Sequence, residues 1–131
     1  MSQISSKTFA AAAALTLMLA SSAAFAQAAK VADTPKGKAY VDAAKGMTLY
    51  TFDKDSEGKS ACNGPCATNW PPLMAAADAK ASGDWTIVTR DDGSKMWALK
   101  GKPVYTFAKD TKPGDTTGDG FLNGAWHIAK P

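Results

Sequence analysis

The chain has 131 residues, with 15 Lys or Arg, 12 Asp or Glu and a formal net charge of +3. The basic residues are scattered singly and are not interleaved with the aromatic ones, so the composition argues against a nucleic-acid partner. The length suits one domain with one modest core.

Residues 1–26 have the features of a secretory signal peptide. Lys7 is their only charge, Ala10–Ala20 is a run of Ala, Leu, Met and one Thr, and a small-x-small pattern ends at Ala26. We predict cleavage after Ala26, with Ala28 as the alternative, and a periplasmic or secreted location. The run is shorter than the roughly 20 residues of a membrane span. No Cys lies near the cleavage site, so we expect neither a transmembrane segment nor a lipid anchor.

The first part of the mature chain is predicted to contain a lead-in and a hairpin. Residues 27–38 are rich in Ala, Lys and Gly, and we expect them to form a flexible lead-in. Residues 39–42 and 48–53 follow as strands, the second because it is rich in β-branched and aromatic residues. They are joined by a turn at 43–46, where Gly46 can supply a positive φ.

The middle of the chain carries few strand signals. Polar residues 55–60 predict a loop. Residues 67–70 have room for one helical turn, which Pro71 and Pro72 stop because proline lacks the N–H and clashes with the preceding turn. Residues 73–80 are Ala-rich and predict a short helix or an irregular surface segment.

The clearest strand signal lies in the second half. Residues 84–90 alternate along a strand pattern, and Asp92-Gly93 predicts a hairpin turn to a partner strand at 95–99. A strand at 104–108, a Gly- and Asp-rich loop at 110–124 and a closing strand at 125–128 complete this half. Strands at short, turn-punctuated spacing predict an antiparallel arrangement.

The first half of the chain is repeated in the second. Residues 43–55 return as residues 98–110, with eight of thirteen positions identical. Further on, with an offset one residue longer, Gly58, Gly64 and Trp70 align with Gly114, Gly120 and Trp126. We therefore predict a mainly β fold, a small antiparallel β domain of two pseudo-repeated hairpin units with at most one or two short helices. This single domain spans 39–131, and its repeats span about 39–80 and 84–131.

Each repeat contains a Tyr-x-Phe-x-x-Asp motif. The six motif residues are Tyr50, Phe52, Asp55, Tyr105, Phe107 and Asp110. Tyr and Phe two apart share one face of a strand and bury a large area, and Asp followed by Ser or Thr ends a strand well. The alternative is a paired acid–phenol site, but a Tyr and an Asp five apart point to opposite faces of one strand. We therefore interpret the motif as structural.

Three motifs together carry a family resemblance. They are the doubled Tyr-Thr-Phe-x-Lys-Asp, the segment Cys-Asn-Gly-Pro-Cys-Ala-Thr-Asn-Trp-Pro-Pro-Leu at 62–73, and Gly-Ala-Trp-His-Ile-Ala at 124–129. Over residues 38–131 the chain resembles the bacterial secreted-repeat family of lipoprotein-like proteins with a Yx(FWY)xxD motif. The resemblance implies export and tandem repeats, and it implies no reaction. The chain departs from the lipoprotein pattern because it lacks a cysteine for lipidation.

Cys62 and Cys66 are the only cysteines, and we expect a disulfide because an exported chain meets an oxidising environment. Two alternatives stay open. Gly64-Pro65-Cys66 is similar to the Cys-Gly-Pro-Cys of thioredoxin, which would make the pair redox-active. The two sulfurs and His127, the only His, would instead suit copper or another transition metal.

One histidine without a nucleophile motif does not make a catalytic triad, so we assign no catalytic residue. We expect a non-catalytic binding or interaction module for an envelope partner or a small ligand, with no cofactor. The alternative is a periplasmic redox or copper-handling protein that uses the Cys62/Cys66 pair.

Overall fold

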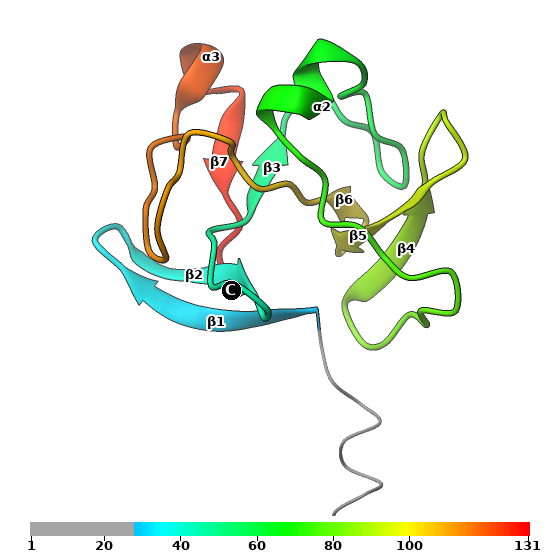
Figure 1. The fold of residues 1–131 in the computed structure, drawn as a ribbon, viewed down its shortest axis with the longest axis horizontal. Helices are drawn as coiled ribbons and strands as arrows, with labels where there is room; N and C mark the ends of the chain where they lie inside the picture. The colour runs from blue at the N-terminus through cyan, green and yellow to red at the C-terminus, as the bar shows by residue number, and fades with distance from the viewer. Residues whose placement is uncertain (1–27) are drawn as a thin grey trace, which may run out of the picture.

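The computed structural model describes residues 28–131, and the predicted signal peptide at 1–26 lies outside them. This part of the chain is mainly β, with antiparallel strand pairs and two short helices, as the sequence predicts (Figure 1). The elements in chain order are β1 (Ala29–Thr34), β2 (Gly37–Asp42), β3 (Tyr50–Phe52), α2 (Pro65–Asn69), β4 (Trp85–Thr89), β5 (Lys95–Leu99), β6 (Lys102–Pro103), α3 (Phe121–Gly124) and β7 (Trp126–Ile128).

The first hairpin corrects the prediction of a flexible lead-in at 27–38. β1 and β2 pair from Ala29 opposite Asp42 to Thr34 opposite Gly37. The Thr34 hydroxyl closes the turn by donating to the Gly37 carbonyl oxygen at 2.7 Å, and Gly37 takes a φ of 99° that few other residues tolerate. The composition of this segment is that of a linker, but backbone pairing with β2 and burial of Ala29 hold it in place.

The second hairpin confirms the strongest local prediction. β4 and β5 pair antiparallel, and the Arg90 N–H donates to the Ser94 carbonyl oxygen at 2.7 Å across the turn. Gly93 within the turn has a φ of 88°. β5 then pairs on its other side with the short β6, where Ala98 lies opposite Pro103.

The motif segments of the two repeats meet at the centre of the molecule. Tyr50 of β3 lies opposite Tyr105, and the two residues exchange both backbone hydrogen bonds, at 2.8 and 2.9 Å. The prediction of a regular strand at 104–108 is wrong. Tyr105 forms only isolated bridges, to Tyr50 and to Pro72. The segment therefore links the β5–β6 pair to the β3–β7 pair.

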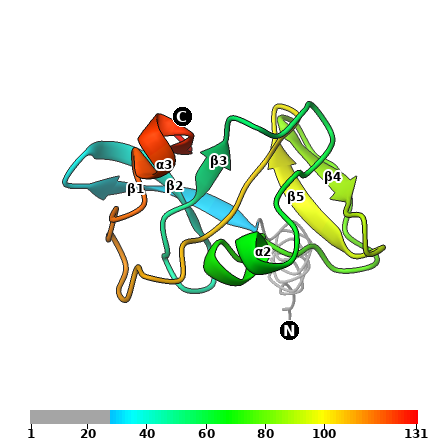
Figure 2. The same cartoon turned by 90° about the horizontal axis from the view of Figure 1, so that it is seen from above.

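An approximate two-fold relation connects the repeats. The Asp53 N–H donates to the Ala125 carbonyl oxygen at 2.8 Å, and the equivalent Ala108 N–H donates to the Asn69 carbonyl oxygen at 2.9 Å. In Figure 1 the hairpins β1–β2 and β4–β5 lie on either side of the central β3 and β7, with α2 and α3 at the same end. Figure 2 shows the same two hairpins on opposite sides of β3.

Helix α2 agrees with the predicted helical turn, since it begins at Pro65 and ends at Asn69, before Pro71. Helix α3 falls inside the loop predicted at 110–124, which corrects that prediction. Its Leu122 and Asn123 both take a φ of 57°, a left-handed conformation that no helix pattern in the sequence signals.

The core consists of two clusters. The larger contains three of the four motif aromatics and both equivalent tryptophans, and the half-buried Phe52 packs against it. Its members are Ala39, Tyr50, Cys62, Trp70, Val88, Met96, Ala98, Tyr105, Phe107, Trp126 and Ile128. The smaller contains Ala29, Leu49, Leu99, Val104 and Ala129. Burying one such Leu or Val side chain fully stabilises the fold by roughly 1.5–3 kcal/mol.

Candidate functional site

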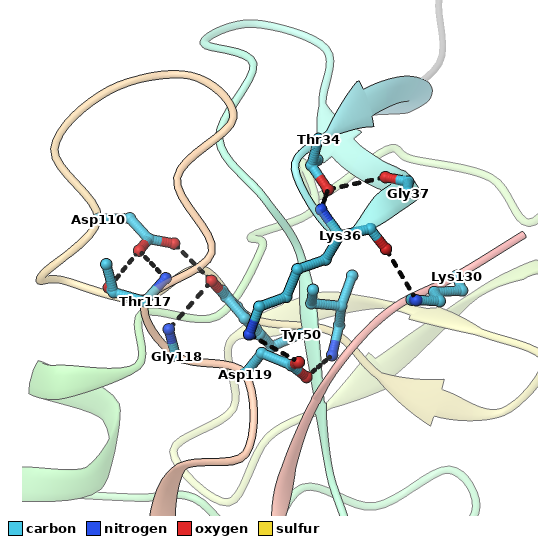
Figure 3. A network of polar contacts seen from close by, with 10 residues as sticks. Thr34, Lys36, Gly37, Tyr50, Asp110, Thr117, Gly118, Asp119 and Lys130 are labelled. Atoms are coloured by element: carbon cyan, nitrogen blue, oxygen red, sulfur yellow. Dashed lines mark hydrogen bonds and ion pairs between the residues drawn. The ribbon is translucent and has the colours of Figure 1, made fainter.

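The structure pairs each motif tyrosine with the motif aspartate of the other repeat. Tyr50 Oη donates to Asp110 Oδ2 at 2.7 Å (Figure 3), and Tyr105 Oη donates to Asp55 Oδ2 at 2.6 Å. Within one repeat the opposite parity of Tyr and Asp keeps them apart, but the antiparallel meeting of the repeats brings each pair together. The acid–phenol pairs, which strand parity makes the less expected alternative, are therefore present between repeats.

Backbone N–H groups donate to the second carboxylate oxygen of both aspartates in the same way. The Ala61 N–H donates to Asp55 Oδ1 at 2.7 Å, and the Thr117 N–H donates to Asp110 Oδ1 at 3.0 Å. The Thr117 hydroxyl donates to the same oxygen of Asp110. The two carboxylates are thus held in equivalent loops, each turned toward the phenol of the other repeat.

The environment keeps both phenols protonated. Burial, reinforced by the hydrogen bond to Asp110, holds the pKa of Tyr50 far above its ordinary value. Burial and the bond to Asp55 do the same for the pKa of Tyr105. Burial also raises the pKa of Asp55, against the opposing effect of the Tyr105 hydroxyl and the Ala61 N–H. At neutral pH the two tyrosines therefore act as hydrogen-bond donors.

A stack of four aromatic rings fills the space between the Tyr–Asp pairs. Trp70 and Trp126 lie nearly parallel, with centroids 3.8 Å apart. Phe52 stacks on the outer face of Trp126 at 4.1 Å, and Phe107 stacks on Trp70 at 4.0 Å. Rings from the two repeats alternate through the stack, so it joins the repeats as well as filling the core.

The motif tyrosines meet this stack with their ring edges. The Tyr50 ring lies 5.4 Å from that of Trp70, and the Tyr105 ring lies 5.2 Å from that of Trp126, both near perpendicular. Sequence alignment of the repeats already paired the two tryptophans but gave them no role. Their similar sequence distance from the two motifs, 20 residues after Tyr50 and 21 after Tyr105, was the signal that could have placed them beside the motifs.

A buried arginine is the part of the site that sequence reasoning missed. Arg90, the only arginine of the chain, donates to Ser60 Oγ at 3.1 Å and to the Cys62 carbonyl oxygen at 2.8 Å. Ser60 Oγ lies 2.6 Å from Tyr105 Oη, which connects Arg90 to the Tyr105–Asp55 pair. The signal in the sequence that could have indicated this role was a single arginine at the end of a predicted strand.

The predicted disulfide is present, because Cys62 and Cys66 are bonded to each other. His127 lies elsewhere, on β7, where its Nε2 is 2.9 Å from Asp53 Oδ2 on an exposed surface. Between residues 28 and 131, no group of three or more His, Cys, Asp or Glu side chains is arranged to hold a metal ion. The structure therefore joins the two cysteines but pairs His127 with a carboxylate.

Two hollows open on the surface of residues 28–131. The larger, of about 480 Å³, lies between the two hairpins and is lined by residues 29–31, Tyr40 and residues 82–85. The rings of Tyr40 and Trp85 meet there edge to face at 5.3 Å. The smaller, of about 190 Å³, lies beside Phe52.

These features define a class: a duplicated small β domain in which the motif tyrosine of each repeat bonds to the motif aspartate of the other. The chain belongs to the family described as a secreted repeat of unknown function, whose family model matches residues 30–74 and again 86–130. The resemblance predicted from the sequence is thereby confirmed. Comparison with curated proteins and with solved structures found no match. In the described part of the chain, no helix has the length and apolar character to cross a membrane.

Proposed function

We propose that this secreted-type repeat protein is a non-catalytic binding module, and that it takes an extended peptide segment of an envelope partner in the hollow between the hairpins. The observation that carries the proposal is the position of this hollow beside an unpaired strand edge. The motif side chains bond to one another in the core, so recognition is left to the surface.

The unpaired edge belongs to β1. The Ala43 N–H donates to the Ala28 carbonyl oxygen at 2.8 Å, and bonding alternates along an antiparallel pair. The backbone groups of Ala29, Val31 and Asp33 therefore point away from β2. Within residues 28–131, β2 is the only strand that pairs with β1. A row of free N–H and C=O groups is matched by another extended backbone, as in recognition by strand addition.

The hollow beside this edge supplies side-chain contacts. Val31, directly opposite Tyr40 in the hairpin, is 43% exposed, and Trp85 stands across the hollow. Lys30 and Asp84 add one charge of each sign to the lining. A volume of about 480 Å³ falls in the usual range for ligand pockets. These surroundings suit an extended segment that carries an apolar or aromatic side chain.

The test combines site-specific crosslinking with a backbone variant. A photo-crosslinking amino acid at position 31, and at the exposed Leu122 as a control, is used in the exporting cell. The peptide segment joined at position 31 is identified, synthesised and titrated against the purified protein. We expect Val31→Pro to weaken this binding by about fivefold, because it removes an outward N–H worth roughly 1 kcal/mol.

Val31→Ala is the matched control, since it shortens the side chain but keeps the N–H. Edge positions tolerate proline, so we expect both variants to melt like the parent. Equal crosslinking at positions 31 and 122, or equal affinity of the Pro and Ala variants, would contradict the proposal.

The redox or copper alternative predicts a different outcome. After reduction of the Cys62–Cys66 bond, a one-to-one Cu(I) complex would form and would disappear in the Cys62→Ala, Cys66→Ala double variant. Such a complex, in a protein that captures no peptide at position 31, would favour the alternative.

A further inference from the structure

Six buried or half-buried side chains form one continuous array across the two-fold relation. In order they are Asp110, Tyr50, Trp70, Trp126, Tyr105 and Asp55. The array reads carboxylate, phenol, indole, indole, phenol, carboxylate. A well-packed core requires apolar rings here, but it does not require that the two most readily oxidised aromatic types lie in contact with a proton acceptor at each end.

We propose that this array is a one-electron relay. A one-electron metal-complex oxidant takes an electron from the Trp70–Trp126 pair without binding to it, and the electron hole then moves to Tyr50, where it forms a tyrosyl radical. This activity is independent of the peptide site proposed above. It concerns the interior of the protein and not the β1 edge.

The stacked indoles are suited to carry the electron hole. Their rings lie 3.8 Å apart at 2° to each other, so a positive charge is shared between them. Phe52 and Phe107 cover the two outer faces, and aromatic faces stabilise a cation placed over them. Competing thiols are missing from the described residues, because both cysteines are in the disulfide.

The electron hole does not stay on Trp126. Its Nε1 is buried and has no hydrogen-bond partner among residues 28–131, so an oxidised Trp126 has no acceptor for its indole proton. A phenol that loses an electron must also lose its proton, and both motif tyrosines already donate to a carboxylate. The tyrosines are therefore the sites at which the oxidised state can become neutral.

Electrostatics favour Tyr50 over Tyr105. The buried Arg90 lies near Tyr105 and is connected to it through Ser60. Its positive charge opposes the removal of an electron from Tyr105. Around Tyr50 the neighbours are Asp110, the Gly118 N–H at 3.3 Å and, nearby, Asp119. Figure 3 shows this surrounding, with Asp119 tied to Lys36 at 3.2 Å on the solvent side.

The step balances in electrons and protons. The oxidant gains one electron from the indole pair, and Tyr50 returns one electron to the indole pair through Trp70. The O–H bond of Tyr50 breaks, and an O–H bond forms on Asp110. The products are the reduced oxidant, a neutral tyrosyl radical and a protonated carboxyl group. One electron from a reductant, with return of the proton, restores the starting state.

The experiment uses the whole mature protein with Tyr40→Phe as the parent, so that only the two motif tyrosines remain. A ruthenium tris-bipyridyl complex, photo-oxidised by persulfate, is the probe. Electron paramagnetic resonance identifies the radical, and transient absorption follows its rise. We expect a tyrosyl signal that is lost in Tyr50→Phe and kept in Tyr105→Phe. Its rise should slow in heavy water, because a proton moves with the electron.

Two further proteins keep the proposal falsifiable if Tyr50→Phe does not fold. Difluorotyrosine at position 50 retains the hydroxyl and should add fluorine splitting to the radical spectrum. Trp70→Phe retains a stacked ring and should slow or abolish the rise. An unsplit spectrum, a signal that persists in folded Tyr50→Phe, or a rate unchanged by Trp70→Phe would each overturn the relay.

Discussion

At the scale of single residues, the two Tyr–Asp pairs are the feature with the largest consequence. Asp110 is buried and Asp55 is half-buried, and each depends on a phenol from the other repeat. A buried acceptor that loses its donor costs more than the bond itself contributes, because the group has already left water. The hydroxyls are therefore needed even though the rings alone would fill the core.

We predict that Tyr50→Phe and Tyr105→Phe each lower the free energy of unfolding by about 1–3 kcal/mol. Tyr40→Phe is the matched control, since the Tyr40 hydroxyl has no bond to any described residue, and we expect little change. Denaturant titration of the three variants measures the effect. Similar stability of all three would show that the aspartates do not depend on the phenols.

The sequence indicates this site only in part. The motif shows which residues are involved, and the interpretation as core aromatics agrees with the burial of Tyr50, Tyr105 and Phe107. Strand parity ranks the pairing of phenol with carboxylate below a structural role, an argument that holds within a repeat. What it omits is that duplication gives each tyrosine a second aspartate. That contact is fixed by how the repeats meet, which local patterns do not encode.

At the scale of elements, equivalent segments of the two repeats occupy similar positions but are held there by different interactions. α2 begins beside the Cys62–Cys66 bond, whereas the equivalent segment around α3 has Gly118 and Leu122 at those positions. A Cβ on Gly118 would lie 2.6 Å from the ring of Trp70, so no cysteine fits there. The disulfide is thus a local brace of one repeat.

We predict that the Cys62→Ala, Cys66→Ala double variant stays folded and loses about 2 kcal/mol, as expected for a short loop in the chain-entropy model. Alanine is chosen because Cys62 is fully buried and a serine hydroxyl would need a partner. Thermal unfolding of the parent with and without reductant, beside the variant, measures the effect. A variant that fails to fold would show that the bond holds more than its own loop.

Element prediction succeeds where the signal is local. The Asp92-Gly93 turn fixes the β4–β5 hairpin, and Pro71 marks the region after α2. β1 was missed because only Ala29 of its side chains is buried, which leaves no apolar alternation to detect. α3 was missed because its backbone is left-handed at two non-glycine residues.

At the scale of the whole molecule, neither repeat is self-sufficient. The stack alternates rings from the two repeats, and β3 of the first repeat pairs with β7 of the second. A separated repeat would expose half of the stack and leave its motif phenol and carboxylate without partners.

We therefore predict that the segments 28–80 and 84–131, produced separately, are each unfolded, and that they fold when mixed. Circular dichroism and the near-ultraviolet signal of the stacked tryptophans report the outcome. A mixture in which one segment carries Trp126→Ala should not recover the signal. If either segment folds alone as a monomer, the repeats are independent domains.

The exchange of contacts between the two repeats also affects how two copies of the chain can associate. Every contact between repeats joins a first repeat to a second repeat. The first repeat of one molecule can therefore make the same contacts with the second repeat of another molecule. What favours the closed monomer is the tether at residues 76–83, which keeps a chain's own second half at a high effective concentration. Shortening that tether until it no longer spans the gap turns the same contacts into an exchanged dimer, with no new interface required.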